Sequence, residues 1–502
     1  MSPMETIPPP HIYDKLVGSL GWEAASRDPQ VLESYSRDDS FAKPLPPALV
    51  AWPRSTADVQ LIVRFAAEHG APVIAVSSAP GYRQRGDTVP TRPGSLVMDL
   101  SKMNSILRID RKNRVAMVEP GVTFGQLIPE VERQGLRLLQ PLCPRKGKSV
   151  LASALEREPV TIPRYHWDAS DPLLCTELVF GTGDLFRTGS AAGPGTLEEQ
   201  LAAGSAQKNP MGPTQFSLFQ TVQGAQGTLA IATWATLKCE LKPSLQKVRY
   251  AQADDLGGLR DFAHGLLKFR IGDELMIMNR RAFSSLAAGE TGDPQGIMPG
   301  LREWLLVAVL SGRGESAGER VAYLESDLAE IARRSGASPE TGLDGISNEG
   351  MLAALSSACE RPWQYRSRGA CQPIFFITTL DRADSFVGIA RETLRDSPAY
   401  LRDFGVYIQP LLQGCNCHLE FQLHYDPKSG AEVEETARAF TSLSRSLMEG
   451  GAFFSRPYGE WAAGMFERVP PETIETLRRV KRIFDPKGIL KPGALCFQEV
   501  SQ

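Results

Sequence analysis

The sequence lacks the features of a membrane-spanning protein and of a nucleic-acid-binding protein. No stretch approaches the roughly 20 consecutive apolar residues that a spanning helix needs. The net charge of the 502-residue chain is −3, so no overall basic field attracts nucleic acid or an anionic membrane. The Pro-rich residues 1–10 contain no charged segment followed by an apolar one, as a signal peptide would. We therefore expect a cytoplasmic protein, and leave open its association with a membrane complex through a partner.

The sequence also lacks the spacings that hold metals, disulfides or a Rossmann-bound dinucleotide. Its 8 cysteines are scattered, and none forms a Cys-x-x-Cys pair. We therefore predict no disulfide framework, no zinc site and no iron–sulfur cluster in this chain. If the protein passes electrons to a cluster, that cluster belongs to another polypeptide. No Gly-x-Gly-x-x-Gly fingerprint is present, so a dinucleotide would have to be bound in another way.

Hydrophobic patterning predicts two α+β domains, in keeping with a length that is too great for one. Residues 1–45 end in a Pro-rich run and are predicted to form an N-terminal arm. Residues 46–243 alternate short strands with helices, and Gly or Pro stands at nearly every joint. The strongest predicted elements of this part are a helix over 56–69, which Gly70 ends, and strands over 72–76, 96–100, 115–119, 173–180 and 228–241.

A second α+β domain is predicted over residues 244–466, followed by a C-terminal segment, 467–502. Long helices are expected at 316–334, 385–395 and 432–448, with strands at 304–310, 374–380, 407–412 and 418–425. The last segment combines a helix over 474–484 with a rigid turn rich in Pro and Gly.

Three runs of residues resemble one family of flavoproteins. The first is 97–124, where a strand ending in Asp99-Leu-Ser is followed by a two-strand ribbon and by Pro120-Gly-Val at a helix entrance. The others are the Gly-rich run 223–229 and the closing run 484–493. Together they resemble the FAD-linked oxidases of the vanillyl-alcohol oxidase and 4-cresol dehydrogenase type, near the D-lactate dehydrogenase and glycolate oxidase flavoprotein subunits. The resemblance implies a two-subdomain FAD-binding domain of this (PCMH) type plus a cap domain for substrate.

The resemblance also implies which residues bind FAD. A pyrophosphate needs several converging N–H donors, and glycines let the backbone approach it closely. Residues 77–88 stand where the family has its Gly-rich phosphate loop; here hydroxyls would donate and Arg83 and Arg85 would offset charge. A polar surface turn is the alternative for this loop. The predicted cofactor-binding residues are Ser77, Ser78, Gly81, Tyr82, Gly86, Asp87, Thr88, Pro120, Gly121, Ser149, Ser153, Gly224, Gln226, Gly227, Thr228, Leu229 and Lys491.

Residues 77–88 depart from the family's phosphate loop, because Gly81 and Gly86 are their only glycines, and a second departure lies in residues 141–171. Residues 141–171 lack the family's Gly pair, although Tyr165, His166 and Trp167 stand where the family's chain passes the flavin ring. His166 has a second interpretation as a partly buried structural histidine. Residues 77–88 contain no His or Cys for a covalent link, so we predict non-covalent FAD.

A polar strand in the second domain supplies the predicted base. On an extended strand the side-chain period is two, so His418, Glu420 and His424 point to one face. This face suits general-base chemistry on a hydroxyl or, as an alternative, a metal. An exposed polar strand face is the structural alternative. The run 413–421 is similar to the His-containing region of the D-lactate and glycolate relatives, with cysteines replacing its Gly-Asp elements.

The function predicted from the family is an FAD-dependent dehydrogenase of a small hydroxy-acid-like substrate. His418 with Glu420 would take the hydroxyl proton, and Arg456 or Arg368, with Tyr458, would orient an anionic group. Electrons would pass to a separate iron–sulfur or quinone-linked partner. One alternative is a 4-alkylphenol oxidase or dehydrogenase that holds a phenolate with tyrosines 365, 425 and 458 and Arg456. The other is a non-catalytic electron-relay subunit.

Overall fold

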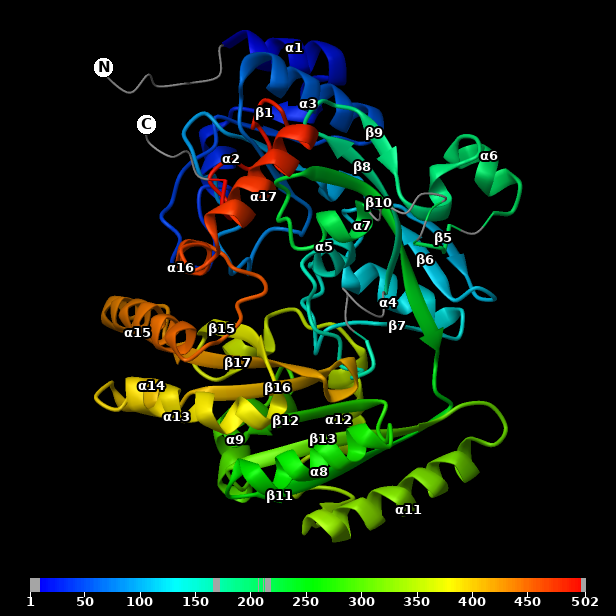
Figure 1. Cartoon of the computed structure of the whole chain (residues 1–502), viewed down its shortest axis with the longest axis vertical. Helices are drawn as coiled ribbons and strands as arrows, with labels where there is room; N and C mark the ends of the chain where they lie inside the picture. Colours follow the sequence, from blue (N-terminus) through cyan, green and yellow to red (C-terminus); the bar gives the residue numbers. More distant parts are fainter. Residues whose placement is uncertain (1–9, 166–171, 206, 211, 213–217, 498–502) are drawn as a thin grey trace.

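The computed structural model describes residues 10–165, 172–205, 207–210, 212 and 218–497. The described chain contains three sheets, two in the upper half of Figure 1 and one in the lower half. In the first sheet, β1-β2-β4-β3, the last three strands are parallel. Its elements are α1 (Pro10–Leu20), β1 (Ala25–Ser26), α2 (Pro29–Ser34), β2 (Leu49–Ala51), α3 (Thr56–His69), β3 (Val73–Val76) and β4 (Leu96–Asp99).

The local sequence determines where helix α3 begins and ends and which of its faces packs under this sheet. The Ser55 side chain accepts a hydrogen bond from the Asp58 N–H at its start, and Gly70 ends it with φ +65°. Its apolar stripe, including Val59 and Ile62, packs into the core beneath the sheet.

The second sheet is antiparallel, with strand order β5-β6-β10-β8-β9 and β7 added to β10. Its long strand β10 pairs with β6, β7 and β8, and helices α4 and α5 pack on its core. Its elements are β5 (Ile106–Asp110), β6 (Val115–Val118), α4 (Phe124–Arg133), β7 (Leu136–Leu138), α5 (Val150–Leu155), β8 (Leu173–Phe180), β9 (Leu185–Arg187), α6 (Leu197–Ala202), α7 (Leu218–Val222) and β10 (Ala230–Leu241).

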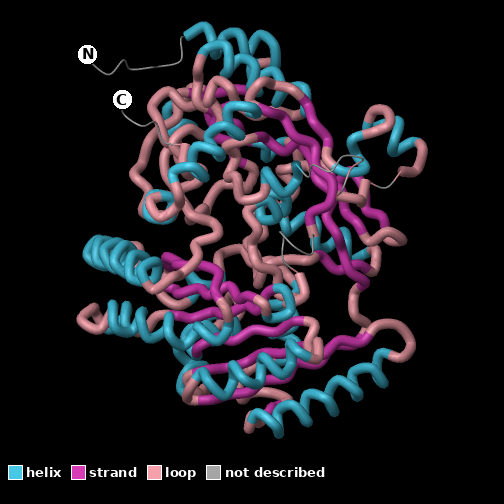
Figure 2. Tube along the Cα trace, viewed as in Figure 1, coloured by secondary structure: helices cyan, strands magenta, loops and turns pink. Residues whose placement is uncertain are grey.

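The third sheet has seven antiparallel strands in the order β14-β11-β13-β12-β16-β17-β15. Figure 2 shows the long helices that accompany it in the lower half. Its elements are β11 (Leu245–Ala253), α8 (Leu256–Lys268), β12 (Glu274–Asn279), α9 (Arg280–Ala287), α10 (Pro294–Ile297), β13 (Trp304–Gly312), α11 (Ala317–Ser335), β14 (Pro339–Glu340), α12 (Asn348–Ser356), β15 (Ala370–Thr378), α13 (Ala383–Thr393), α14 (Ala399–Arg402), β16 (Gly405–Leu411), β17 (Asn416–Tyr425) and α15 (Gly430–Glu449).

Alternation along β17 decides which side of this sheet faces the first half of the chain. Leu419, Phe421 and Leu423 belong to the large core under α8, α11, α13 and α15. Residues between them, such as His418 and Glu420, point to the opposite face. In Figure 1, β15 and β17 are the strands of this sheet drawn closest to the upper half.

The C-terminal segment returns from the third sheet to the first half. It contains α16 (Glu460–Phe466) and α17 (Pro471–Phe484), and α17 lies beside the N-terminal elements in Figure 1. The Asp485 carboxylate accepts hydrogen bonds from the Ile489 and Leu490 N–H groups and pairs with Lys481 at 2.7 Å. Leu490 then forms a β-bridge with Val73 of β3.

A cluster of arginines and carboxylates joins the two halves at the end of β10. Arg137 of β7 contacts Glu274 of β12 at 2.5 Å, and Arg313 contacts Glu240 of β10 at 3.3 Å. Arg137 and Arg313 also share Asp273. These partly buried ion pairs therefore connect the second sheet to the third at this junction.

The predicted α+β fold class is confirmed, and most predicted elements end within a few residues of the observed ones. The division at residues 45, 243 and 466 remains our proposal; the chain passes from the second sheet to the third between β10 and β11. No helix of the described chain is long and apolar enough to cross a membrane.

Candidate functional site

Two cavities adjoin each other between the sheets. The cofactor-side cavity, about 120 Å³, lies within the first half and is lined by β3, α5, the 223–229 run and the C-terminal segment. The interdomain cavity, about 180 Å³, lies between residues 78–88 and the free face of the third sheet. Asp87, Glu156 and Arg456 line both cavities. A ligand in one cavity therefore meets a ligand in the other at this shared wall.

The cofactor-side cavity has apolar walls, and at Gly227 its wall is backbone without a side chain. Gly227 has φ +76°, and a Cβ placed on it would meet no atom within 4 Å. Any other L residue would be strained there, and its side chain would enter the cavity. The apolar walls are Val76, Leu100, Pro120, Leu151, Leu155, Leu178, Val222 and Ile231.

Lys491 supplies a cation to the same cavity. It is 5% exposed, and it forms no salt bridge with any residue that the structure describes. Burial lowers its pKa, although Asp87 and Glu156 act in the opposite sense. Apolar walls, a bare glycine edge and an unpaired buried cation suit a ligand with an aromatic ring system and an anionic group. These residues fit FAD.

His418 stands on the floor of the interdomain cavity. The floor is the free face of the third sheet, where Phe375 and Tyr407 both lie opposite Glu420 on neighbouring strands. His418 is 2% exposed; its Nε2 lies 3.5 Å from Glu420 Oε2, while its Nδ1 has no hydrogen-bond partner. An N–H directed from Nε2 to the carboxylate leaves the Nδ1 lone pair free to accept a proton.

Burial and hydrogen bonding set the charges of this pair. Burial lowers the pKa of His418 below its ordinary value of 6.5, even though Glu420 acts to raise it. Burial alone would raise the pKa of Glu420, but hydrogen bonds from His418, Gln422 and Gln364 lower it. The imidazole is therefore neutral and the carboxylate ionised near neutral pH, as a histidine base requires.

Arg456 is a buried cation fixed at the wall between the cavities. It is 4% exposed, its Cζ lies 4.2 Å from the centroid of the Phe375 ring, and its Nη1 has no hydrogen-bond partner. Burial and then repulsion from Arg85 lower its pKa to about 10. The residues on either side are tied to the first half: Arg157 donates to the Ser455 carbonyl and Gln226 to the Pro457 carbonyl.

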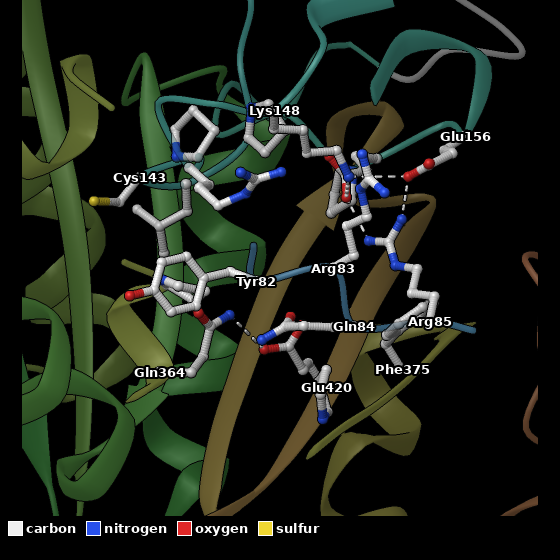
Figure 3. Close-up of a pocket in the computed structure, with 18 of the residues that line it drawn as sticks. Tyr82, Arg83, Gln84, Arg85, Cys143, Lys148, Glu156, Gln364, Phe375 and Glu420 are labelled. Carbon is white, nitrogen blue, oxygen red and sulfur yellow. Dashed lines mark hydrogen bonds and ion pairs between the residues drawn. The ribbon is translucent and has the colours of Figure 1, made fainter. Parts of the chain in front are cut away.

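The predicted phosphate-neutralising residue Arg85 is engaged by carboxylates instead. Arg85 contacts both Glu156 and Glu158, and Lys148 lies 3.0 and 2.7 Å from the same two residues (Figure 3). The two cations and two anions balance one another, so Arg85 has little charge left for a phosphate. Ser153 Oγ donates to Glu158 at 2.6 Å, which turns this predicted cofactor residue toward the cluster.

The structure divides the other predicted cofactor residues into two groups. Those on a cavity wall are Ser77, Ser78, Tyr82, Asp87, Thr88, Pro120, Gly224, Gln226, Gly227 and Lys491. The remaining ones line neither cavity: Gly81, Gly86, Gly121, Ser149, Ser153, Thr228 and Leu229. A Cβ on Gly121 would come within 2.7 Å of three backbone carbonyl oxygens, so this turn requires glycine.

Among the predicted substrate-binding residues, His418, Glu420, Arg456 and Tyr458 line a cavity and Arg368 does not. Arg368 pairs with Glu432 at 2.7 Å and lies over the Tyr400 ring, away from both cavities.

The tyrosines expected to hold a phenolate are dispersed. Of these three tyrosines, Tyr458 alone lines a cavity. Tyr365 donates a hydrogen bond to Asp39 at 3.0 Å, and Tyr425 lies outside both cavities. Tyr165 donates to Glu240 instead of lining a cavity, and His166 and Trp167 lie outside the described residues.

The described residues do not support the alternative of a metal site at His418, Glu420 and His424. His424 is fully buried away from the cavities, and burial lowers its pKa to about 3. Among the described residues, no group of three or more His, Cys, Asp or Glu side chains is placed to hold a metal ion.

Sequence reasoning missed Phe375, Tyr407, Gln364, Glu156 and Glu158. The two glutamates carried a signal, since two carboxylates flank Arg157 just after the short helix 150–155. Nothing in the sequence indicated that Phe375 and Tyr407 would lie on the cavity floor, because this depends on which strands of the third sheet become neighbours.

Comparison with known proteins gives the same fold and cofactor. The model of the FAD binding domain matches residues 47–189, and that of the C-terminal domain of FAD linked oxidases matches residues 461–495. An uncharacterized FAD-linked oxidoreductase of Mycobacterium tuberculosis is 26% identical over 506 residues, covering 96% of this chain and 98% of the relative. Glycolate oxidase subunit GlcD of Bacillus subtilis is 24% identical, covering 93% and 92%.

A solved structure shows the same architecture over the whole chain. The crystal structure of p-cresol methylhydroxylase with substrate bound has a TM-score of 0.80 at 19% sequence identity, covering 97% of this chain and 96% of that one. The cavity beside the 223–229 run thus lies in a fold shared with that enzyme. This chain therefore contains an FAD binding domain and the C-terminal domain of FAD linked oxidases, as its motifs indicate, and it is an FAD-dependent oxidoreductase.

Proposed function

We propose that the protein is a dehydrogenase of a small hydroxy acid, whose substrate binds in the interdomain cavity. The observation that carries this proposal is that Arg456 and His418 line one cavity, while Arg456 Nη1 and His418 Nδ1 have no hydrogen-bond partner among the described residues. The guanidinium suits a carboxylate, and the imidazole suits a hydroxyl proton. FAD, when bound, supplies the two-electron oxidation.

The chain's own residues have separate roles in this proposal. Arg456 binds the carboxylate and, through Phe375 beneath it, is held at one place in the cavity. His418 takes the hydroxyl proton at Nδ1, and Glu420 stabilises the imidazolium that forms. Tyr458 closes the cofactor-side cavity behind Arg456. Non-covalent FAD and a separate electron-accepting partner, iron–sulfur or quinone-linked, complete the proposal.

Oxidation of a 4-alkylphenol is the second candidate, because Tyr407 and Tyr82 also line the interdomain cavity. A panel of substrates added anaerobically separates the two chemistries. Loss of flavin absorbance near ~450 nm with 2-hydroxy acids and not with alkylphenols supports the first. Reduction by neither class in the isolated protein would instead favour an electron-relay subunit.

We expect acid precipitation to release all of the FAD into the supernatant. Residues 77–88 contain no His or Cys, and no described His or Cys lines the cofactor-side cavity. Flavin absorbance of the supernatant and pellet measures the partition. A yellow pellet would contradict the prediction and would direct attention to His418, Cys143 and the cavity tyrosines.

We expect Gly227→Val to abolish FAD retention, because the new side chain would enter the cofactor-side cavity. The matched control is Gly336→Val, at the C-terminal cap of α11. Gly336 has φ +73° and open space around it, like Gly227, but lies on neither cavity. Both variants thus carry a similar backbone strain. The ratio of flavin to protein absorbance measures the outcome; equal FAD content in the two variants would show that the 223–229 run does not contact the cofactor.

We expect His418→Ala to leave the flavin spectrum unchanged and to slow substrate-driven flavin reduction by roughly 10²–10⁴-fold, the usual contribution of a positioned base. Stopped-flow absorbance with the hydroxy acid found in the panel measures this rate. The control is His424→Ala, which removes an imidazole from the same strand face but outside the cavities. A rate for His418→Ala within threefold of the parent would remove this histidine from the mechanism.

A further inference from the structure

Two further arginines line the interdomain cavity without a carboxylate partner. Arg83, labelled in Figure 3, donates through Nη2 to the Ser78 carbonyl at 2.7 Å. Its Cζ lies 5.5 Å from the centroid of the Tyr35 ring, and its Nε is buried without a hydrogen-bond partner. Arg145 donates to the Ala79 carbonyl at 3.1 Å. Backbone carbonyls therefore hold both guanidiniums in place, and neither guanidinium forms an ion pair with a described residue.

The two arginines repel each other, and neither has a carboxylate within ion-pair distance among the described residues. Neither forms a salt bridge within 4 Å with any described residue, whereas Arg85 and Lys148 in the same cavity are paired with Glu156 and Glu158. Burial and then the charge of Arg83 lower the pKa of Arg145 to about 10. The charge of Asp39 acts on Arg145 in the opposite sense, but its carboxylate lies beyond ion-pair distance and accepts a hydrogen bond from the Tyr365 hydroxyl. Partly buried cations in this state need an anion from outside the chain.

We infer that Arg83 and Arg145 form a second oxyanion subsite, so that the substrate is a hydroxy acid with a further carboxylate or phosphate. This inference rests on the proposed function, in which Arg456 binds the carboxylate next to the reacting carbon. One cavity then offers cations at two places, Arg456 over Phe375 and the arginine pair beneath residues 78–79. A ligand with one anionic group satisfies one of them, and a dianionic ligand satisfies both.

The competing occupant of this subsite is the pyrophosphate of FAD, because Arg83 lies within residues 77–88. The lining of the two cavities favours the substrate. Arg83 and Arg145 line only the interdomain cavity, together with His418 and Glu420, whereas Ser77 and the Gly227 edge line only the cofactor-side cavity. The experiment must nevertheless measure the cofactor content of each variant.

The test measures binding of unreactive acids to the FAD-loaded protein through the change that they cause in the flavin absorbance. The probes are dicarboxylates from malonate to adipate, each paired with the monocarboxylate of equal carbon number, and 2-phosphoglycolate. We expect one dicarboxylate, or 2-phosphoglycolate, to bind at least ~10-fold more tightly than the monocarboxylate, as a charge-assisted pair contributes. A preference for dicarboxylates identifies a second carboxylate as the partner, and a preference for 2-phosphoglycolate identifies a phosphate.

Arg83→Gln and Arg145→Gln should each abolish that preference and leave monocarboxylate affinity and FAD content unchanged. Arg145→Lys, which keeps the charge, should retain part of it. The control is Arg361→Gln, because Arg361 lies over the Tyr82 ring at 5.9 Å but does not line the cavity. Equal affinity for mono- and dianions in the parent, or loss of FAD from the glutamine variants, would overturn the inference. Arginine-dependent dianion binding without any flavin reduction by hydroxy acids would leave the subsite standing and remove the dehydrogenase proposal.

Discussion

The site depends on one charge that the protein buries without neutralising it. Arg456 lies on the wall that the two cavities share, with an unpartnered Nη1 and an aromatic ring on one side. Taking a guanidinium out of water costs several kcal/mol unless an anion or hydrogen bonds compensate for it. Hydrogen bonds hold the chain on both sides of Arg456 in place: Arg157 donates to the Ser455 carbonyl, and Gln226 donates to the Pro457 carbonyl. In our proposal the carboxylate of the substrate supplies the remaining compensation, which would place the substrate at this wall.

The rest of the architecture sets what stands around this charge. The 223–229 run contributes Gln226, which holds the Arg456 loop, and Gly227, which leaves room in the cofactor-side cavity. Successive side chains of β17 point to opposite faces of the sheet, so His418 lines the cavity and Leu419 packs in the core on the other side. The arginine and carboxylate cluster at the end of β10 connects the third sheet to the second. Cofactor binding and the proposed base are therefore coupled through one wall.

Local signals in the sequence were sufficient for the elements and for part of the site. The helix at 56–69 has its cap, its apolar stripe and its terminal glycine within the sequence, and it forms as predicted. The one-face arrangement of His418 and Glu420 follows from a period of two. The partners of Arg85, by contrast, come from residues 156 and 158, and the neighbours of His418 come from β15 and β16. Such contacts depend on strand order and domain docking, which no local pattern contains. The sequence favoured Arg456, through the rigid Pro457 beside it, but still left Arg368 as a candidate.

The most direct test of this account is the affinity of Arg456→Gln for 2-hydroxyisobutyrate. This 2-hydroxy acid has no hydrogen on the carbon that would be oxidised, so it binds without turnover and its binding is read from the flavin absorbance. The account predicts that the variant keeps its FAD and binds the acid about 10- to 100-fold more weakly than the parent, the usual loss for a hydrogen bond to a charged group. Equal affinity in the two proteins would show that the buried guanidinium does not bind the substrate carboxylate, and would contradict the account.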